Sequence, residues 1–140
     1  MTGSGVMSFE QWVPYAPARV WEALTDPSLL ARWWASGDIA PEVGHRFTLD
    51  MGAWGGRACR VLDVATGESI SYTFAEGLLD TVITWYLDSE GSGTRVGLIH
   101  YGFDLDSAAG RQAYEGMGEG WPTVLARIAQ ALESPAADGS

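Results

Sequence analysis

The stretch YEGMGEGWPTVLARIAQALE, residues 114–133, has the apolar spacing of an amphipathic helix but an unusual composition for one. Its apolar residues recur every three or four positions and predict a buried stripe of Tyr114, Met117, Trp121, Val124 or Leu125, Ile128 and Leu132. Three glycines and Pro122 fall in its first half. Each glycine there costs about 1 kcal/mol, and an interior proline about 3 kcal/mol, relative to alanine. We predict a long terminal helix over about residues 107–133, weakened or kinked at Pro122.

Small residues form a second line on this predicted helix, directly beside the apolar stripe. Ala113, Gly116 and Gly120 make up this line, which we call the small-residue lane. A helix face without side chains can let the helix backbone approach a sheet closely, or it can leave room for a bound molecule. The sequence leaves both alternatives open.

The rest of the chain reads as one strand, two short helices and a run of further strands. The first strand is expected at residues 6–13. The helices are expected to begin at Pro17 and Pro27, the second capped by Asp26 and ending near Trp34. Strand-like runs separated by turn sequences follow at residues 46–52, 57–65, 69–75, 80–88 and 94–103, with a hairpin connection at residues 89–93.

This order of elements predicts an α+β fold in which one sheet wraps around one long helix. Consecutive strands joined by short turns form an antiparallel meander, and a twisted sheet of this kind curls around the one long helix that can cover it. We therefore expect a curved six-stranded antiparallel sheet wrapped around the C-terminal helix, with the two short helices between the first two strands. A chain of 140 residues, 46% of them hydrophobic, fits a single domain, predicted over residues 1–134, with a disordered tail at residues 135–140.

Charge and composition narrow the classes of function. A net charge of −10 disfavours binding to nucleic acid or an acidic membrane. The sequence has no apolar run long enough to cross a bilayer and no signal-peptide pattern, so we expect a cytoplasmic protein without membrane insertion. With Cys59 as the only cysteine, and His45 and His100 as the only histidines, neither a metal site nor a cofactor is expected.

Strand parity predicts which side chains face the helix. Alternate residues of a strand point to the same face of a sheet, so three inward sets follow: Ile70, Tyr72 and Phe74; Ile83, Trp85 and Leu87; and Val96, Leu98 and His100. The third set is favoured over the alternative of Ile99 and Tyr101.

Few residues offer catalytic chemistry. His100 is a candidate general base, although a histidine hydrogen-bonded at a strand end is the more common case. Glu119 shares a helix face with Glu115 and could move a proton, but such pairs more often face water. There is no G-x-S-x-G motif, and Cys59 has arginines nearby but no evident base.

Aromatic side chains are the better candidates for contact with a ligand. Two adjacent tryptophans, Trp33 and Trp34, end a predicted helix and cannot both enter one core, while Trp54 lies on a glycine-rich turn. Together with inward residues of the strands and of the terminal helix, the predicted ligand-binding set is Trp33, Trp34, Trp54, Tyr72, Phe74, Trp85, Leu98, His100, Tyr114, Met117 and Trp121.

Four segments in this order resemble a known family: VPYAPARVWEALTDPSLLARWW, VGHRF, DTVITWYLDSEGSGTRVGLIHYGF and YEGMGEGWPTVLARIAQALE. The chain is similar to proteins related to the activator of the ninety-kilodalton heat-shock protein ATPase, within the START-like (SRPBCC, or Bet v-type) superfamily of helix-grip domains. The resemblance implies a cavity between the curved sheet and the first part of the last helix, closed at one end by the two short helices. Members of this superfamily include carriers, cyclases and cochaperone domains, so the fold does not choose among these activities.

Three functions are consistent with these observations. The first is binding of a hydrophobic or aromatic small molecule, oriented by polar groups such as His100, Tyr72 or Arg60. The second is a polyketide cyclase-, dehydratase- or hydrolase-like enzyme acting on a hydrophobic substrate. The third, a cochaperone-type interaction domain, is ranked last because the acidic chain has no evident docking motif. The sequence leaves open whether the chain forms a homodimer.

Overall fold

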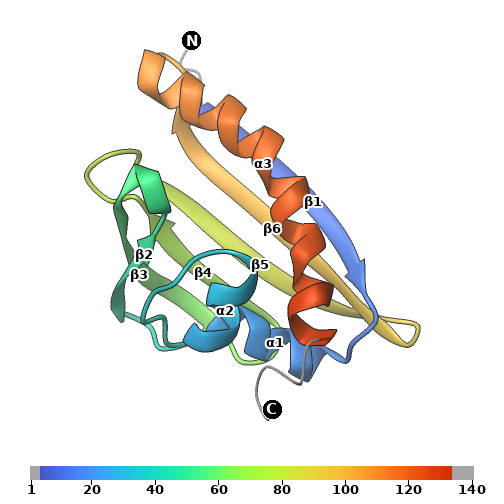
Figure 1. Cartoon of the computed structure of the whole chain (residues 1–140). Coiled ribbons are helices and arrows are strands. Elements are labelled where there is room, and N and C mark those ends of the chain that lie inside the picture. Colours follow the sequence, from blue (N-terminus) through green and yellow to red (C-terminus); the bar gives the residue numbers. More distant parts are fainter. Residues whose placement is uncertain (1–3, 134–140) are drawn as a thin grey trace.

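The elements follow one another in the order predicted from the sequence (Figure 1). The computed structural model describes residues 4–133. They form β1 (Ser4–Val13), α1 (Pro17–Thr25), α2 (Pro27–Trp33), β2 (Arg46–Asp50), the short 3-10 helix η1 (Gly52–Trp54), β3 (Gly56–Ala65), β4 (Ser69–Phe74), β5 (Thr81–Glu90), β6 (Gly93–Asp104) and α3 (Ala108–Glu133). The tail predicted at residues 135–140 lies outside the described residues.

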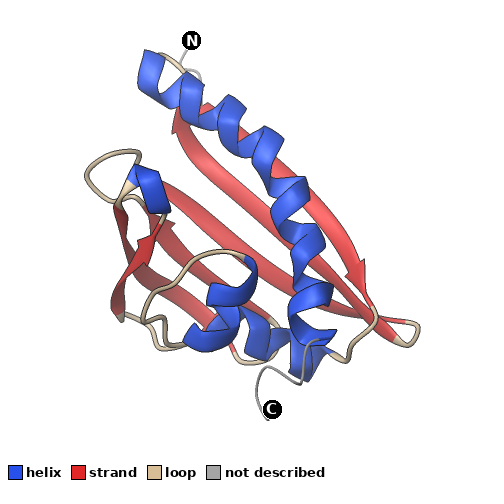
Figure 2. Cartoon of the chain, in the orientation of Figure 1, coloured by secondary structure: helices blue, strands red, loops and turns tan. Residues whose placement is uncertain are grey.

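The strands form one six-stranded antiparallel sheet in the order β1-β6-β5-β4-β3-β2. Helix α3 lies across β1 and β6 on one face of this sheet, and α1 and α2 pack at one end of the same face (Figure 2). The pairing register of β3 shifts between Val61 and Asp63. Shifts of this kind bend a strand and increase its twist, which helps the sheet to curve toward the helices. The predicted α+β helix-grip fold is confirmed.

The three inward sets predicted by strand parity are also confirmed. Residues of β4 and β5 alternate between buried and partly exposed positions, with Tyr72, Ile83 and Trp85 fully buried. In β6 the set that contains Leu98 and His100 is buried, whereas Tyr101 is exposed on the opposite face.

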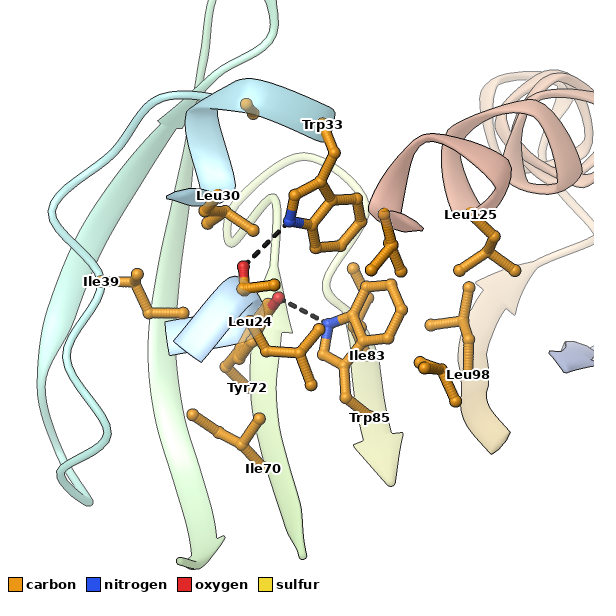
Figure 3. Close-up of a cluster of buried hydrophobic side chains, with 14 of the residues drawn as sticks. Leu24, Leu30, Trp33, Ile39, Ile70, Tyr72, Ile83, Trp85, Leu98 and Leu125 are labelled. Atoms are coloured by element: carbon orange, nitrogen blue, oxygen red, sulfur yellow. Dashed lines mark hydrogen bonds between the residues drawn. The ribbon is translucent and has the colours of Figure 1, made fainter. Parts of the chain in front are cut away.

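The core under α1 and α2 is solidly packed (Figure 3). The ring of Trp33 meets that of Trp85 edge-on, with 5.5 Å between their centroids. Their indole N–H groups are both used inside the core: Trp33 Nε1 donates to the Ala23 carbonyl at 2.9 Å, and Trp85 Nε1 donates to the Tyr72 hydroxyl at 2.8 Å. Each buried indole therefore has its hydrogen bond, which a buried polar group requires.

Helix α3 buries its C-terminal half more completely than its first half. Trp121, Leu125 and Ile128 are buried, whereas Tyr114 and Met117 are only partly buried. The weakening expected at Pro122 does not end the helix, because α3 continues through that residue and Pro122 lies at an exposed position. None of the described helices is both long and apolar enough to cross a membrane.

Candidate functional site

The small-residue lane borders open space. A Cβ built on Gly116 or Gly120 would meet no atom within 4 Å, whereas one built on Gly118 would lie 3.9 Å from Met7 in β1. Successive residues of an α-helix are rotated by about 100°. Gly116 and Gly120 therefore point away from β1, roughly opposite to Gly118. At these two glycines the helix therefore faces open space and does not make the close backbone approach that was one of the two alternatives.

Tyr114 fastens the first half of α3 to the edge of the sheet. Its hydroxyl donates to the Val6 carbonyl at 3.1 Å, and its ring meets Phe103 with 5.4 Å between centroids. Gly5 is required beneath this ring, because an added Cβ would lie 2.6 Å from Tyr114 Cδ1. Tyr114, predicted to contact a ligand, thus packs against β1 and β6 instead.

Four aromatic side chains, from the C-terminal end of α2, β4, β5 and α3, meet in one group; we call Trp34, Phe74, Trp85 and Trp121 the aromatic cluster. The Trp34 ring lies 5.2 Å from Trp121, and 6.1 Å from both Phe74 and Trp85, between centroids. Trp34 is partly exposed, while the other three are at most 2% exposed. Trp34 therefore covers the buried rings and presents the accessible surface of the cluster.

The structure corrects the expectation of a hollow directly beneath α3 at Trp121. Trp85 and Trp121 are in edge-on contact there, with 5.6 Å between their centroids. Two large rings in this arrangement gain contact energy and exclude a guest from the space between them. The space between these two rings is therefore not open to a ligand.

His100 is held in one neutral form by its neighbours. An indole N–H can only donate, so the bond from Trp121 Nε1 to His100 Nδ1, at 3.2 Å, makes Nδ1 an acceptor and places the ring proton on Nε2. Nε2 then donates to Thr81 Oγ1 at 2.8 Å, and Thr81 donates to the Phe74 carbonyl at 3.2 Å. Burial lowers the pKa of His100 from 6.5 to about 3. Because its lone pair is occupied and the ring has no access to solvent, the geometry is that of a structural histidine.

The other candidates for proton transfer are not arranged around a common point. Glu119 and Glu115 are exposed on α3, on the side facing water. Cys59 is buried, and burial raises the pKa of its thiol to about 12, the opposite of what a nucleophilic cysteine needs. Arg60 is paired with Glu76, with 3.4 Å between Nε and Oε2. In the described part of the chain, no three His, Cys, Asp or Glu side chains gather as they would around a metal ion.

The predicted ligand-binding residues divide into three groups. Those that form buried core are Trp33, Tyr72, Phe74, Trp85, Leu98, His100 and Trp121. Those that keep some exposure are Trp34, Tyr114 and Met117. The side chain of Trp54, at the end of η1, lies outside what the structure describes.

Thr81 is a residue of this region that the sequence analysis missed. It is fully buried and is the hydrogen-bond partner of His100 Nε2. The signal was present, because Thr81 lies two positions before Ile83 on the inward face of the same strand. A polar residue at an inward strand position implies a hydrogen-bond partner inside the core.

A separate, open depression lies at the far edge of the sheet, near β2 and β3. Its volume is about 240 Å³, and its lining consists of Asp38, Arg46, Phe47, Thr48, Ala58, Cys59 and Glu76. The Arg46 and Glu76 side chains at this site lie 3.8 Å apart. None of its lining residues belongs to the aromatic cluster.

Solved structures similar to this chain come from several bacteria. Protein MLL2253 from Mesorhizobium loti is 31% identical, with a TM-score of 0.82 over 92% of this chain and 97% of its own. Protein BH1534 from Bacillus halodurans is 26% identical, with a TM-score of 0.81 over 94% of this chain and 99% of its own. CalU16 from Micromonospora echinospora, at 20% identity and a TM-score of 0.74 over 99% of this chain and 88% of its own, shares the fold.

No curated protein matches the sequence. Residues 14–133 match the family described as "Activator of Hsp90 ATPase homolog 1-like protein", which covers every element from α1 to α3. This match agrees with the order of the elements, the sheet topology and the related structures. The chain therefore belongs to the Activator of Hsp90 ATPase homolog 1-like family, within the START-like helix-grip fold.

Proposed function

We propose that this protein binds a neutral, flat, hydrophobic small molecule against the exposed side of Trp34, beside Gly120. Two observations support the proposal: Trp34 is a partly exposed indole backed by buried aromatic rings, and there is open space at Gly120, the residue that precedes Trp121 of the same cluster. A planar ligand that contacts the exposed part of Trp34 would add to the aromatic contacts that Trp34 already makes with Phe74 and Trp33. Such aromatic pairs contribute about 0.5–1.5 kcal/mol beyond the area that they bury.

The lane supplies the shape that such a ligand needs. With no side chain at Gly120, a ring can approach the α3 backbone next to Trp121, which a larger residue would prevent. The Trp34 side chain is supported by Trp33, whose ring is stacked at 6.1 Å, so it is held in place before a ligand arrives. A preformed surface of this kind reduces the entropy lost on binding.

The charge of the protein favours a ligand without negative charge. The chain carries a net charge of −10. An anionic ligand would on average be repelled as it approaches the protein.

Binding is favoured over catalysis by the state of the polar groups. His100, the strongest candidate for a general base, has its lone pair engaged by Trp121 and its pKa held far below neutrality by burial. Glu119 faces water and has no catalytic neighbour in the described structure.

The proposal is tested by titrating the protein with neutral polycyclic aromatic compounds and following tryptophan fluorescence and melting temperature. Gly120→Leu would fill the open space, and we expect it to weaken binding at least about fivefold. Ala126→Leu, at an exposed position in the C-terminal half of α3, is the matched control and should leave affinity unchanged. Absence of binding across the panel, or equal affinity in Gly120→Leu and the unaltered protein, would refute the proposed site.

A further inference from the structure

We propose that Trp34 Nε1–H is the hydrogen-bond donor that selects the ligand, so that the preferred ligand is a flat neutral aromatic molecule bearing an acceptor, such as a carbonyl oxygen, at its edge. This inference rests on the proposed function and adds to it a chemical class of ligand and a specificity-determining atom.

The indole N–H groups of the protein differ in what they bind. Those of Trp12, Trp33, Trp85 and Trp121 donate to Glu90, Ala23, Tyr72 and His100 respectively. Trp21 and Trp34 have no acceptor for this group among the described residues. Of these two, only Trp34 belongs to the aromatic cluster, where its ring contacts three other members.

The free donor of Trp34 is accessible rather than buried. No buried side-chain nitrogen or oxygen atom in the described structure lacks a hydrogen-bond partner. Because Trp34 Nε1 has no partner among residues 4–133, it is not one of the buried atoms and is accessible to solvent. A ligand that stacks against the Trp34 side chain displaces water from this surface, and unless it brings an acceptor it leaves the N–H unsatisfied.

The neighbouring polar groups cannot take over this role. His100 and Thr81 are fully buried and bonded to each other. The Tyr72 hydroxyl is fully buried beneath the core and accepts the bond from Trp85. Trp34 Nε1 is thus the donor in the aromatic cluster that a ligand can reach without opening the core.

Two probes of nearly equal shape isolate the hydrogen bond: fluorene and 9-fluorenone, which differ by one carbonyl group. Affinities for both are measured by equilibrium dialysis against the unaltered protein, Trp34→Phe and Trp21→Phe. A hydrogen bond between neutral groups changes affinity by about 3- to 10-fold. We expect the ratio of the two dissociation constants, fluorene to fluorenone, to fall by this factor in Trp34→Phe and to stay unchanged in Trp21→Phe.

A second measurement uses the unaltered chain and does not depend on the folding of a variant. In ¹⁵N-resolved NMR spectra, the Trp34 indole N–H signal should shift downfield with fluorenone and not with fluorene. If both probes bind and the affinity ratio is the same in Trp34→Phe, or the N–H signal responds equally to both, the donor role is refuted and the proposed binding function stands. If neither probe binds, the donor role is refuted, and the panel titration described above decides the binding function separately.

Discussion

His100 should make the stability of this protein fall as the pH drops below about 6.5. In the folded protein, burial lowers the pKa of this histidine from 6.5 to about 3, so the ring stays neutral while the unfolded chain takes up a proton. The unfolded state then binds more protons than the folded state, and the free energy of unfolding decreases by about 1.4 kcal/mol per pH unit in this window. Above about pH 6.5 both states are neutral at His100, and this contribution is constant.

Between about pH 6.5 and pH 5, the expected loss is therefore about 1.6 kcal/mol, because the histidine of the unfolded chain is half protonated at the start of this interval. This interval separates the histidine from the carboxylates. Hydrogen bonds from Arg95 to Glu10 and from Ser28 to Asp26 lower the pKa values of these carboxyl groups below 4.5 and 3.8, so their stabilising effect is lost only at more acidic pH.

The assay is urea unfolding at a series of pH values from about 7.5 to 5, with the free energy of unfolding obtained by linear extrapolation. His100→Gln keeps an acceptor for Trp121 and a donor for Thr81 but cannot be protonated, so the slope should disappear. His45→Gln removes the other histidine of the chain and should keep the slope. A stability that is flat across this range in the unaltered protein, or a slope that persists in His100→Gln, would refute the buried neutral histidine.

Three further predictions concern packing. Trp85→Ala should lower the free energy of unfolding by about 3–5 kcal/mol, because the ring is fully buried in tightly packed core, and a loss below about 1.5 kcal/mol in urea unfolding would contradict this packing. Gly116→Ala should raise the free energy of unfolding by about 0.5–1 kcal/mol, because alanine has a higher helix propensity than glycine and its methyl group would meet no other atom there. Destabilisation in the same assay would argue against open space at this position. Gly5→Ala should lower the free energy of unfolding by about 1–3 kcal/mol, since the new methyl group collides with the Tyr114 ring, and a melting temperature equal to that of the unaltered protein would count against this contact.

The elements and their inward faces could be read from the amino-acid sequence because they depend on local periodicity. Alternation in β4 and β5 identified Tyr72 and Trp85 as inward residues, and the spacing in α3 identified Trp121 and Ile128. The prolines that begin α1 and α2 and the hairpin before β6 are also local signals, and each lies where it was predicted.

Local periodicity could not tell the two adjacent tryptophans apart. Trp33 and Trp34 are the same residue type at neighbouring positions. The sequence therefore indicated only that both side chains could not enter one core, and not which of the two would be buried. Packing of α2 against β5 and α3 sends Trp33 into the core and leaves Trp34 at its border. The prediction of ligand contacts for Trp33, Trp85 and His100 assumed that every aromatic side chain pointing inward lines a cavity. A sequence pattern shows toward which face a side chain points, but it does not show how deeply that side chain is buried.

Local sequence patterns thus established the order of the elements, the inward faces of the strands and the small-residue lane on α3, because each of these depends on residues only a few positions apart. The surroundings of the small-residue lane were decided by contacts between residues far apart in the chain. Tyr114 contacts Val6 and Gly118 lies beside Met7, and these contacts orient α3 so that Gly120 faces open space. The state of His100 was decided in the same way, by Thr81 and Trp121. Such contacts depend on the rotation and distance of packed elements, which no local pattern of apolar residues encodes.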